Sequence, residues 1–211
     1  MTLVVLILLR TRAYPARRNL SWYLVSITVW TACNALAQPR FGESFALWIT
    51  RISFFNAYFI GTSWLWFCAH FPQLSPRFRK LAIVLSLLGL PWLYLVWTPS
   101  ITNEVRFTDR WLEAPVGPYI PWYGLWLFVC LLVGIWHLAR KGKWVHGIAR
   151  MQIRYILLGS YGLLAAGFIF DILVPIVTQS TRHIFYGPLI ASVFVATTTT
   201  ISITRNRLLD I

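Results

Sequence analysis

Long apolar runs dominate this sequence and restrict the folds that it can adopt. An α-helix rises about 1.5 Å per residue, so about 20 mostly apolar residues cross the hydrocarbon core of a bilayer. Six runs reach roughly that length and together hold only two formal charges, Arg51 and Asp171. These runs cover residues 20–38, 46–71, 81–97, 119–138, 155–174 and 188–204. We therefore predict an all-α, polytopic transmembrane helical bundle with six full spans.

A seventh apolar run, residues 1–9, is too short to cross the bilayer as a helix. We interpret it as a partial first helix, which makes the predicted bundle seven-transmembrane-like. A helix that dips in from one face and a cleaved signal peptide are the alternatives. The signal peptide is disfavoured because no basic residue precedes the run and no small-x-small cleavage site follows it. We expect residues 1–211 to form a single transmembrane domain.

The net charge of +13 raises the question of a polyanionic partner. In a soluble protein such an excess of Lys and Arg would indicate nucleic-acid binding. Composition excludes a soluble protein, because only 12% of the residues are charged and 58% are hydrophobic, whereas soluble domains carry about a quarter charged residues. We expect the lipid bilayer, and no nucleic acid, as the partner of this surface.

Basic residues concentrate in alternate loops, and this asymmetry predicts the orientation. Of the 19 basic residues, 14 lie in residues 10–19, 77–80, 139–154 and the tail after residue 204. The opposite loops hold only four basic residues and also four acidic ones. Cytoplasmic loops of membrane proteins are enriched in Lys and Arg. We therefore predict a multi-pass protein of the cell membrane with its C-terminus in the cytoplasm.

The two charges inside the spans are the first candidates for a functional site. Arg51 and Asp171 lie at comparable depth near the predicted outer ends of their spans, and a salt bridge would lower the cost of burying both. Tyr58 shares a helix face with Arg51, and Asn34 lies at a similar depth on the first full span. Two interpretations stay open: an ion pair that fixes helix packing, and the floor of an outward-facing ligand site.

His70 and His137 end two spans at the predicted inner boundary. Two histidines on different helices can ligate a haem iron, but their spacing, and that of Cys68 beside His70, matches no recognised metal motif. We expect no metal and no cofactor. The sequence also has no P-loop, G-x-S-x-G or H-E-x-x-H motif, so we expect no catalytic residue.

Several short motifs follow one another in a characteristic order. They are the basic loop before Asn19-Leu20-Ser21-Trp22, the Phe71-Pro72 pair, the stretch Arg150-Met151-Gln152-Ile153-Arg154, Tyr186-Gly187-Pro188 before the last span, and Arg205-Asn206-Arg207-Leu208-Leu209-Asp210-Ile211 after it. In this order and spacing, the chain resembles the N-terminal seven-transmembrane region of sensor histidine kinases.

The resemblance implies a signal-input module of a two-component system. In such a module the bundle senses a stimulus, and the last helix passes a displacement to a cytoplasmic kinase or other output domain. The signal exit would then consist of Arg205, Arg207, Leu208 and Asp210. The sequence holds no phosphoacceptor helix or ATP-binding domain, so we expect no enzymatic activity from it. A homodimer is a further partnership to consider.

Two other classes of protein stay open from the residues alone. A small membrane anchor or electron-transfer subunit of a larger complex would use His70 and His137. A transporter-like protein would use Arg51 and Asp171 along a solute path, although no inverted repeat is visible to support it.

Arg51→Ala is expected to impair folding or signalling if Arg51 and Asp171 form a buried ion pair. Breaking such a pair costs about 3–5 kcal/mol because it leaves one buried charge uncompensated. Thermal unfolding of the purified protein in detergent measures this loss. Reversing both charges, Arg51→Asp with Asp171→Arg, should restore part of the stability. A silent Arg51→Ala change would contradict the pairing.

Overall fold

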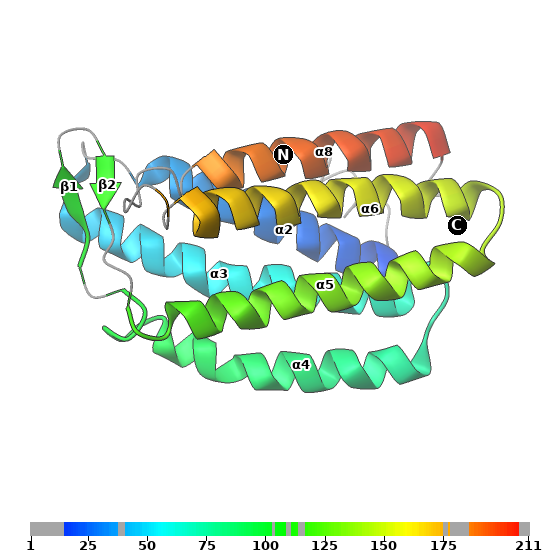
Figure 1. Cartoon of the computed structure of the whole chain (residues 1–211), viewed down its shortest axis with the longest axis horizontal. Helices are drawn as coiled ribbons and strands as arrows, with labels where there is room; N and C mark the ends of the chain where they lie inside the picture. Colours follow the sequence, from blue (N-terminus) through cyan, green and yellow to red (C-terminus); the bar gives the residue numbers. More distant parts are fainter. Residues whose placement is uncertain are drawn as a thin grey trace.

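The computed structural model describes residues 15–37, 41–102, 104–108, 111–113, 117–174, 177 and 186–206. Six α-helices lie in this part of the chain (Figure 1). They are α2 (Pro15–Leu36), α3 (Glu43–His70), α4 (Pro76–Leu95), α5 (Ile120–Trp144), α6 (Ile148–Gly167) and α8 (Tyr186–Asn206). Each covers most of one predicted full span, which confirms the all-α class. The predicted partial helix over residues 1–9 lies outside the described residues.

Three of the six helices are long and apolar enough to cross a membrane. They are α4, α5 and the segment Ile148–Phe170, whereas the apolar part of α8, Gly187–Ser202, is shorter. Helices α2 and α3 are long, at 22 and 28 residues, but many Trp, Tyr, Ser, Thr and Asn residues lower their mean hydropathy. The six predicted helices are therefore confirmed. Their predicted membrane-spanning character is confirmed for three of them.

Two short elements interrupt or extend the helices. A π-helical segment, η2 (Phe168–Leu173), continues α6. The strands β1 (Arg106–Thr108) and β2 (Trp111–Glu113) form an antiparallel hairpin in the long loop between α4 and α5, with Phe107 opposite Leu112. The hairpin lies at one end of the bundle (Figure 1).

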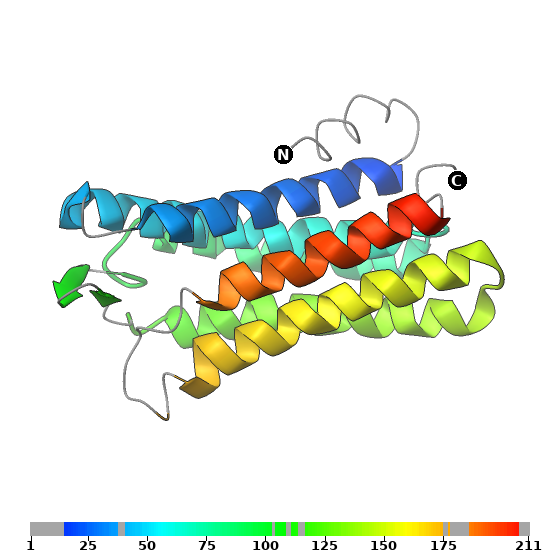
Figure 2. The ribbon, with the colours of Figure 1, turned by 90° about the horizontal axis from the view of Figure 1, so that it is seen from above.

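The helices pack as a ring with one helix outside it. Contacts run in the order α2, α3, α5, α6, α8 and back to α2, and α4 packs against the outer side of α3 and α5. The view in Figure 2 shows α8 between α2 and α6. Helix α3 therefore has neighbours on three sides, and α8 completes the ring.

The basic helix ends gather at the end of the bundle opposite the hairpin (Figure 1). Successive helices run in opposite directions, so the starts of α2, α4 and α6 meet the end of α5 there. The basic residues on these helix ends are Arg17, Arg18, Arg77, Arg79, Lys80, Arg140, Lys141, Lys143, Arg150 and Arg154. The structure thus brings together the loops that the sequence assigns to one side of the membrane.

Trp64 is the largest fully buried side chain among the described residues, and it packs between α3 and α5. Its Nε1 donates a hydrogen bond of 3.2 Å to the carbonyl oxygen of Leu131. The indole fits because residue 134 is a glycine: a Cβ there would collide with Nε1 and lie 2.7 Å from Cδ1 of Trp64. The close approach of α3 and α5 therefore depends on Gly134.

Lys141, near the end of α5, closes the turn between α3 and α4. Its Nζ donates hydrogen bonds to the carbonyl oxygens of Cys68 (3.0 Å), Phe71 (2.8 Å) and Gln73 (2.7 Å). A lysine ammonium has three N–H donors, and the last carbonyls of a helix carry partial negative charge and lack intrahelical partners. Lys141 therefore acts as a C-terminal cap for α3 that is supplied by a different helix.

Gly134→Ala is expected to destabilise the bundle by about 1–3 kcal/mol, because the added methyl group overpacks against Trp64. Thermal unfolding in detergent measures the change. Gly124→Ala on the same helix is the matched control, since nothing lies within 4 Å of a Cβ at Gly124. The control should be neutral or slightly stabilising, because alanine favours helix more than glycine does. Equal destabilisation by both changes would contradict the packing argument.

Lys141→Met is expected to lower the free energy of unfolding by about 1–3 kcal/mol, since the carbonyl groups of the buried residues Cys68 and Phe71 lose their donor. Lys143→Met serves as the control. Lys143 lies two positions after Lys141 and its side chain is exposed, so this change removes a positive charge without removing the cap. Denaturant unfolding of both variants separates the loss of the cap from the loss of charge. Similar unfolding midpoints for the two variants would argue against a capping role.

Candidate functional site

Arg51 joins α3 to the loop that follows α4. Its Nη2 donates a hydrogen bond of 3.3 Å to the carbonyl oxygen of Thr102, a fully buried residue. Its Nε is buried and has no hydrogen-bond partner among the described residues. Arg51 therefore holds the α4–β1 loop against the bundle while part of its guanidinium stays unsatisfied there.

Asp171, the predicted partner of Arg51, lies in the π-helical segment η2. Its side chain lies outside the described part of the structure, so the ion pair stays a prediction. Short π-helical segments occur frequently at functional sites. The uniform apolar character of residues 155–174 gave no indication of such a segment.

Two asparagines connect α2 to α3 at different levels. Asn34 Nδ2 donates to Ser53 Oγ at 3.1 Å and to the carbonyl oxygen of Trp30 at 2.8 Å. Ser53 follows Arg51 by two residues, so Asn34 and Arg51 lie at a similar depth in the bundle. Asn56, which sequence reasoning missed, donates to the carbonyl oxygen of Ser26. These contacts give Asn34 a structural role between two helices.

Tyr58 faces α4 and α5, about two helical turns along α3 from Arg51. Its hydroxyl donates a hydrogen bond of 3.1 Å to the carbonyl oxygen of Ser86 on α4. Its ring stacks on Trp126 of α5, with ring centroids 5.5 Å apart and planes inclined by 8°. Tyr58 thus joins three helices, and it also reaches a groove to which Arg51 and Asn34 do not contribute.

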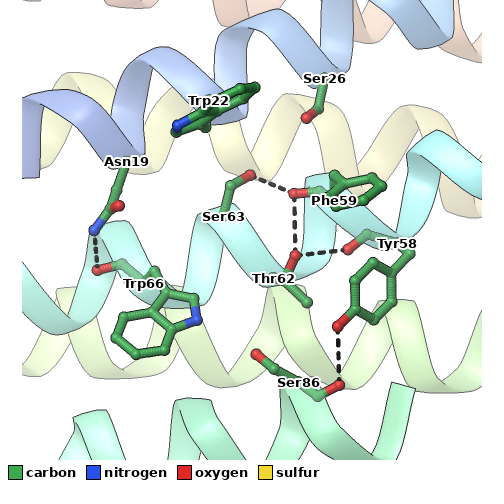
Figure 3. A pocket seen from close by; sticks show the side chains of 9 residues that line it. All are labelled: Asn19, Trp22, Ser26, Tyr58, Phe59, Thr62, Ser63, Trp66 and Ser86. Atoms are coloured by element: carbon green, nitrogen blue, oxygen red, sulfur yellow. Dashed lines mark hydrogen bonds between the residues drawn. The ribbon is translucent and has the colours of Figure 1, made fainter. Parts of the chain in front are cut away.

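This groove lies over α3 and is flanked by α2 and α4 (Figure 3). Its volume is about 280 Å³. Its walls carry both polar and aromatic side chains, and none of the lining residues is charged. The lining residues are Asn19, Trp22, Ser26, Tyr58, Phe59, Thr62, Ser63, Trp66 and Ser86.

The hydroxyl groups of Thr62, Ser63 and Ser86 direct their hydrogens into the protein. Ser86 Oγ donates to the carbonyl oxygen of Ala82 at 2.7 Å, and Thr62 Oγ1 donates to that of Tyr58 at 3.0 Å. Ser63 Oγ donates to the carbonyl oxygen of Phe59. With these hydrogens engaged, each oxygen keeps lone pairs that can accept a hydrogen bond from a molecule in the groove.

Each of the two histidines singled out by the sequence has its own neighbours. His70 Nδ1 lies 2.8 Å from the carbonyl oxygen of Trp66 and 3.3 Å from Asn19 Nδ2. The ring of His137 stacks on Phe78, with centroids 3.8 Å apart. Among the described residues, no group of three or more His, Cys, Asp or Glu side chains could hold a metal ion. Cys68 is fully buried and its thiol is free.

The predicted signal exit lies at the end of α8. Arg205 belongs to the last turn of that helix, and its side chain is not described. Arg207, Leu208 and Asp210 lie outside the described residues. The described part of α8 packs mainly against α6 and also against α2, and Thr31 Oγ1 on α2 lies 3.5 Å from the carbonyl oxygen of Pro188.

Sequence reasoning placed Tyr58 and Thr62 on one polar face of their helix but did not predict the groove. The groove residues come from three helices and are as many as 67 positions apart, from Asn19 to Ser86. The available signal was the number of Ser, Thr and Asn residues within otherwise apolar runs. That signal marks polar positions but does not tell which of them converge.

Comparison with known proteins agrees with the architecture. All of residues 1–211 match the family described as the N-terminal 7TM region of histidine kinase. No curated protein and no solved structure matches the chain. The matched region accounts for the whole chain and contains no catalytic domain. With membrane-length helices in one bundle and a family match from end to end, this multi-pass membrane protein belongs to the family of N-terminal 7TM regions of histidine kinases.

Proposed function

We propose that residues 1–211 act as one signal-input module, in which α8 carries a stimulus-dependent displacement to a cytoplasmic kinase or other output domain. The observation that carries this proposal is the position of α8. It is the last described helix, and it closes the ring between α6 and α2. A change in the spacing of the other helices would therefore shift α8 along or across its two neighbours.

The α6–α8 interface suits a helix that moves. Gly159 on α6 faces Thr198 and Val195 on α8, and a Cβ at residue 159 would collide with Thr198 Oγ1. The buried positions nearby on α8 carry small hydroxyl side chains, Thr199 and Ser202. Small residues let helices approach closely in a membrane. The larger Phe194 of α8 packs over Gly162 of α6, so a shift of about 1–2 Å would carry its ring along this glycine.

The orientation of the module rests on its basic residues. The helix ends that carry these residues gather at one end of the bundle, and α8 ends at that same end (Figure 1). By the positive-inside rule, this end and the C-terminus lie in the cytoplasm. A signal leaving through α8 would then arrive on the side of the membrane that holds ATP.

Signalling by α8 requires two arrangements of similar free energy and a stimulus that favours one of them. A ligand shifts such an equilibrium only by its differential affinity for the two states. A helix that is tightly interdigitated with its neighbours would have a single deep minimum. A relay through α8 therefore requires that the glycine and hydroxyl contacts of this helix allow a second arrangement of similar free energy.

A fusion of residues 1–211 to the cytoplasmic part of a histidine kinase tests the relay. Gly159→Leu, which pushes α8 away from α6, should change basal kinase autophosphorylation in membranes several-fold in either direction. Gly124→Leu, on α5 in open space, should leave it unchanged. Kinase activity in intact cells would also confirm a cytoplasmic C-terminus. Equal output from the two variants, at equal amounts of folded protein, would argue against a relay through α8.

A further inference from the structure

The groove over α3 opens sideways, toward the lipid. Trp22 on α2 is 58% exposed and Phe59 on α3 is 40% exposed, so the walls of the groove lie on the outer surface of the bundle. Ser86 follows the first residue of α4, Pro76, by ten positions, which places it about 15 Å along that membrane-length helix. In a multi-pass membrane protein, a surface at this depth faces the hydrocarbon region.

Ser26 carries the one hydroxyl group of the groove for which no hydrogen bond is found among the described residues. The residue is 3% exposed, and its hydroxyl points from α2 into the groove (Figure 3). No hydrogen bond to this hydroxyl is found among the described residues, although the Ser26 carbonyl accepts one from Asn56. A buried polar group without a partner has a cost of about 1–3 kcal/mol, and lipid chains supply no partner.

The indole N–H groups of Trp22 and Trp66 add donors to this site. Neither has a hydrogen-bond partner among the described residues, and Figure 3 shows both rings beside the cavity. The hydroxyl oxygens of Thr62, Ser63 and Ser86 supply acceptors, as described above. The groove therefore offers donors and acceptors to an uncharged group and presents aromatic surface beside them.

Charge and size restrict what the groove can hold. Because no charged side chain lines it, an ionised headgroup would lose its hydration without gaining a counter-charge. At about 280 Å³ the groove lies at the small end of ligand sites, which span about 300–1,000 Å³. It therefore accommodates a small polar group with part of a chain and no large headgroup.

We propose that this groove binds the hydroxyl-bearing end of an uncharged membrane-soluble amphiphile, such as a monoacylglycerol or a long-chain alcohol. The ligand enters sideways from the bilayer. Its hydroxyl group hydrogen-bonds to Ser26 and to the neighbouring hydroxyl oxygens, and its chain runs along Trp22 and Phe59. This inference goes beyond the proposed function, since binding does not require that α8 relay a signal.

Photolabelling of the full chain in phosphatidylcholine vesicles tests the proposal directly. The probe is monooleoylglycerol with a diazirine in its acyl chain, and labelled peptides are mapped by mass spectrometry. Saturable labelling of α2, α3 and α4 around the groove is expected. Unlabelled monooleoylglycerol should compete, whereas octadecene, which lacks a hydroxyl group, should not. Non-saturable labelling, or equal competition by octadecene, would overturn the proposal.

Two groove variants and a matched control complete the experiment. Ser26→Ala removes the unpaired hydroxyl and should weaken probe binding about 5- to 10-fold, the equivalent of one hydrogen bond, without loss of thermal stability. Ser63→Phe fills the groove and should abolish saturable labelling. Ser192, a serine on α8 whose hydroxyl bonds to its own helix at Leu189, supplies the controls Ser192→Ala and Ser192→Phe, which should bind normally.

Each outcome bears on one proposal alone. Unchanged labelling of both Ser26→Ala and Ser63→Phe would refute the groove as the binding site. Labelling uses no kinase readout, so intact labelling together with an unresponsive kinase fusion would count against the relay and leave the groove in place.

Discussion

The bilayer supplies no hydrogen-bond partners, and most of the polar contacts in this bundle follow from that constraint. Within the helices, hydroxyl groups turn back to carbonyls of their own turn, as Thr28, Ser86 and Ser160 do. Between the helices, amide and ammonium groups bond to backbone carbonyls, as Asn56 does toward Ser26 and Lys141 does toward the α3–α4 turn. Polar side chains thus join helices through hydrogen bonds to backbone carbonyls.

Polar groups that lack a hydrogen-bond partner are exceptions to this rule. They mark candidate sites for a ligand or for a conformational change. Two examples in the described part of the chain are the buried Nε of Arg51, which has no partner, and the Ser26 hydroxyl, which faces the groove and for which no hydrogen bond is found. The first lies beside the loop that carries the hairpin, and the second lies in a groove open to lipid. In a membrane interior an unsatisfied group is costly to keep. For Arg51 the predicted partner is Asp171, whose side chain lies outside the described residues, and for Ser26 it is the proposed ligand of the groove.

The elements of the fold follow from the sequence more directly than the site does. Helices form where the apolar runs predicted them, and the basic residues that predicted the orientation lie at one end of the bundle, because both depend on local composition. The π-helical segment around Asp171 has no such local signal. In the sequence, Lys141 contributes only one positive charge to a basic loop. Its capping role is hidden because its three carbonyl partners belong to the end of α3 and the turn after it. The groove was equally hidden, because Asn19, Tyr58 and Ser86 converge only through tertiary packing.

Helix α2 connects the groove to α8, the proposed output helix. It supplies Asn19, Trp22 and Ser26 to the groove wall, and its opposite half packs against α8, where Thr31 meets Pro188. A molecule wedged between α2 and α4 favours whichever position of α2 accommodates it. Helix α8 packs against α6 on one side and against α2 on the other. A tilt of α2 therefore changes the space available to α8 between these two helices. The energy available for that shift is limited to the difference in ligand affinity between the two positions. A small shift of α8 against the glycine residues of α6 requires a free energy of that order.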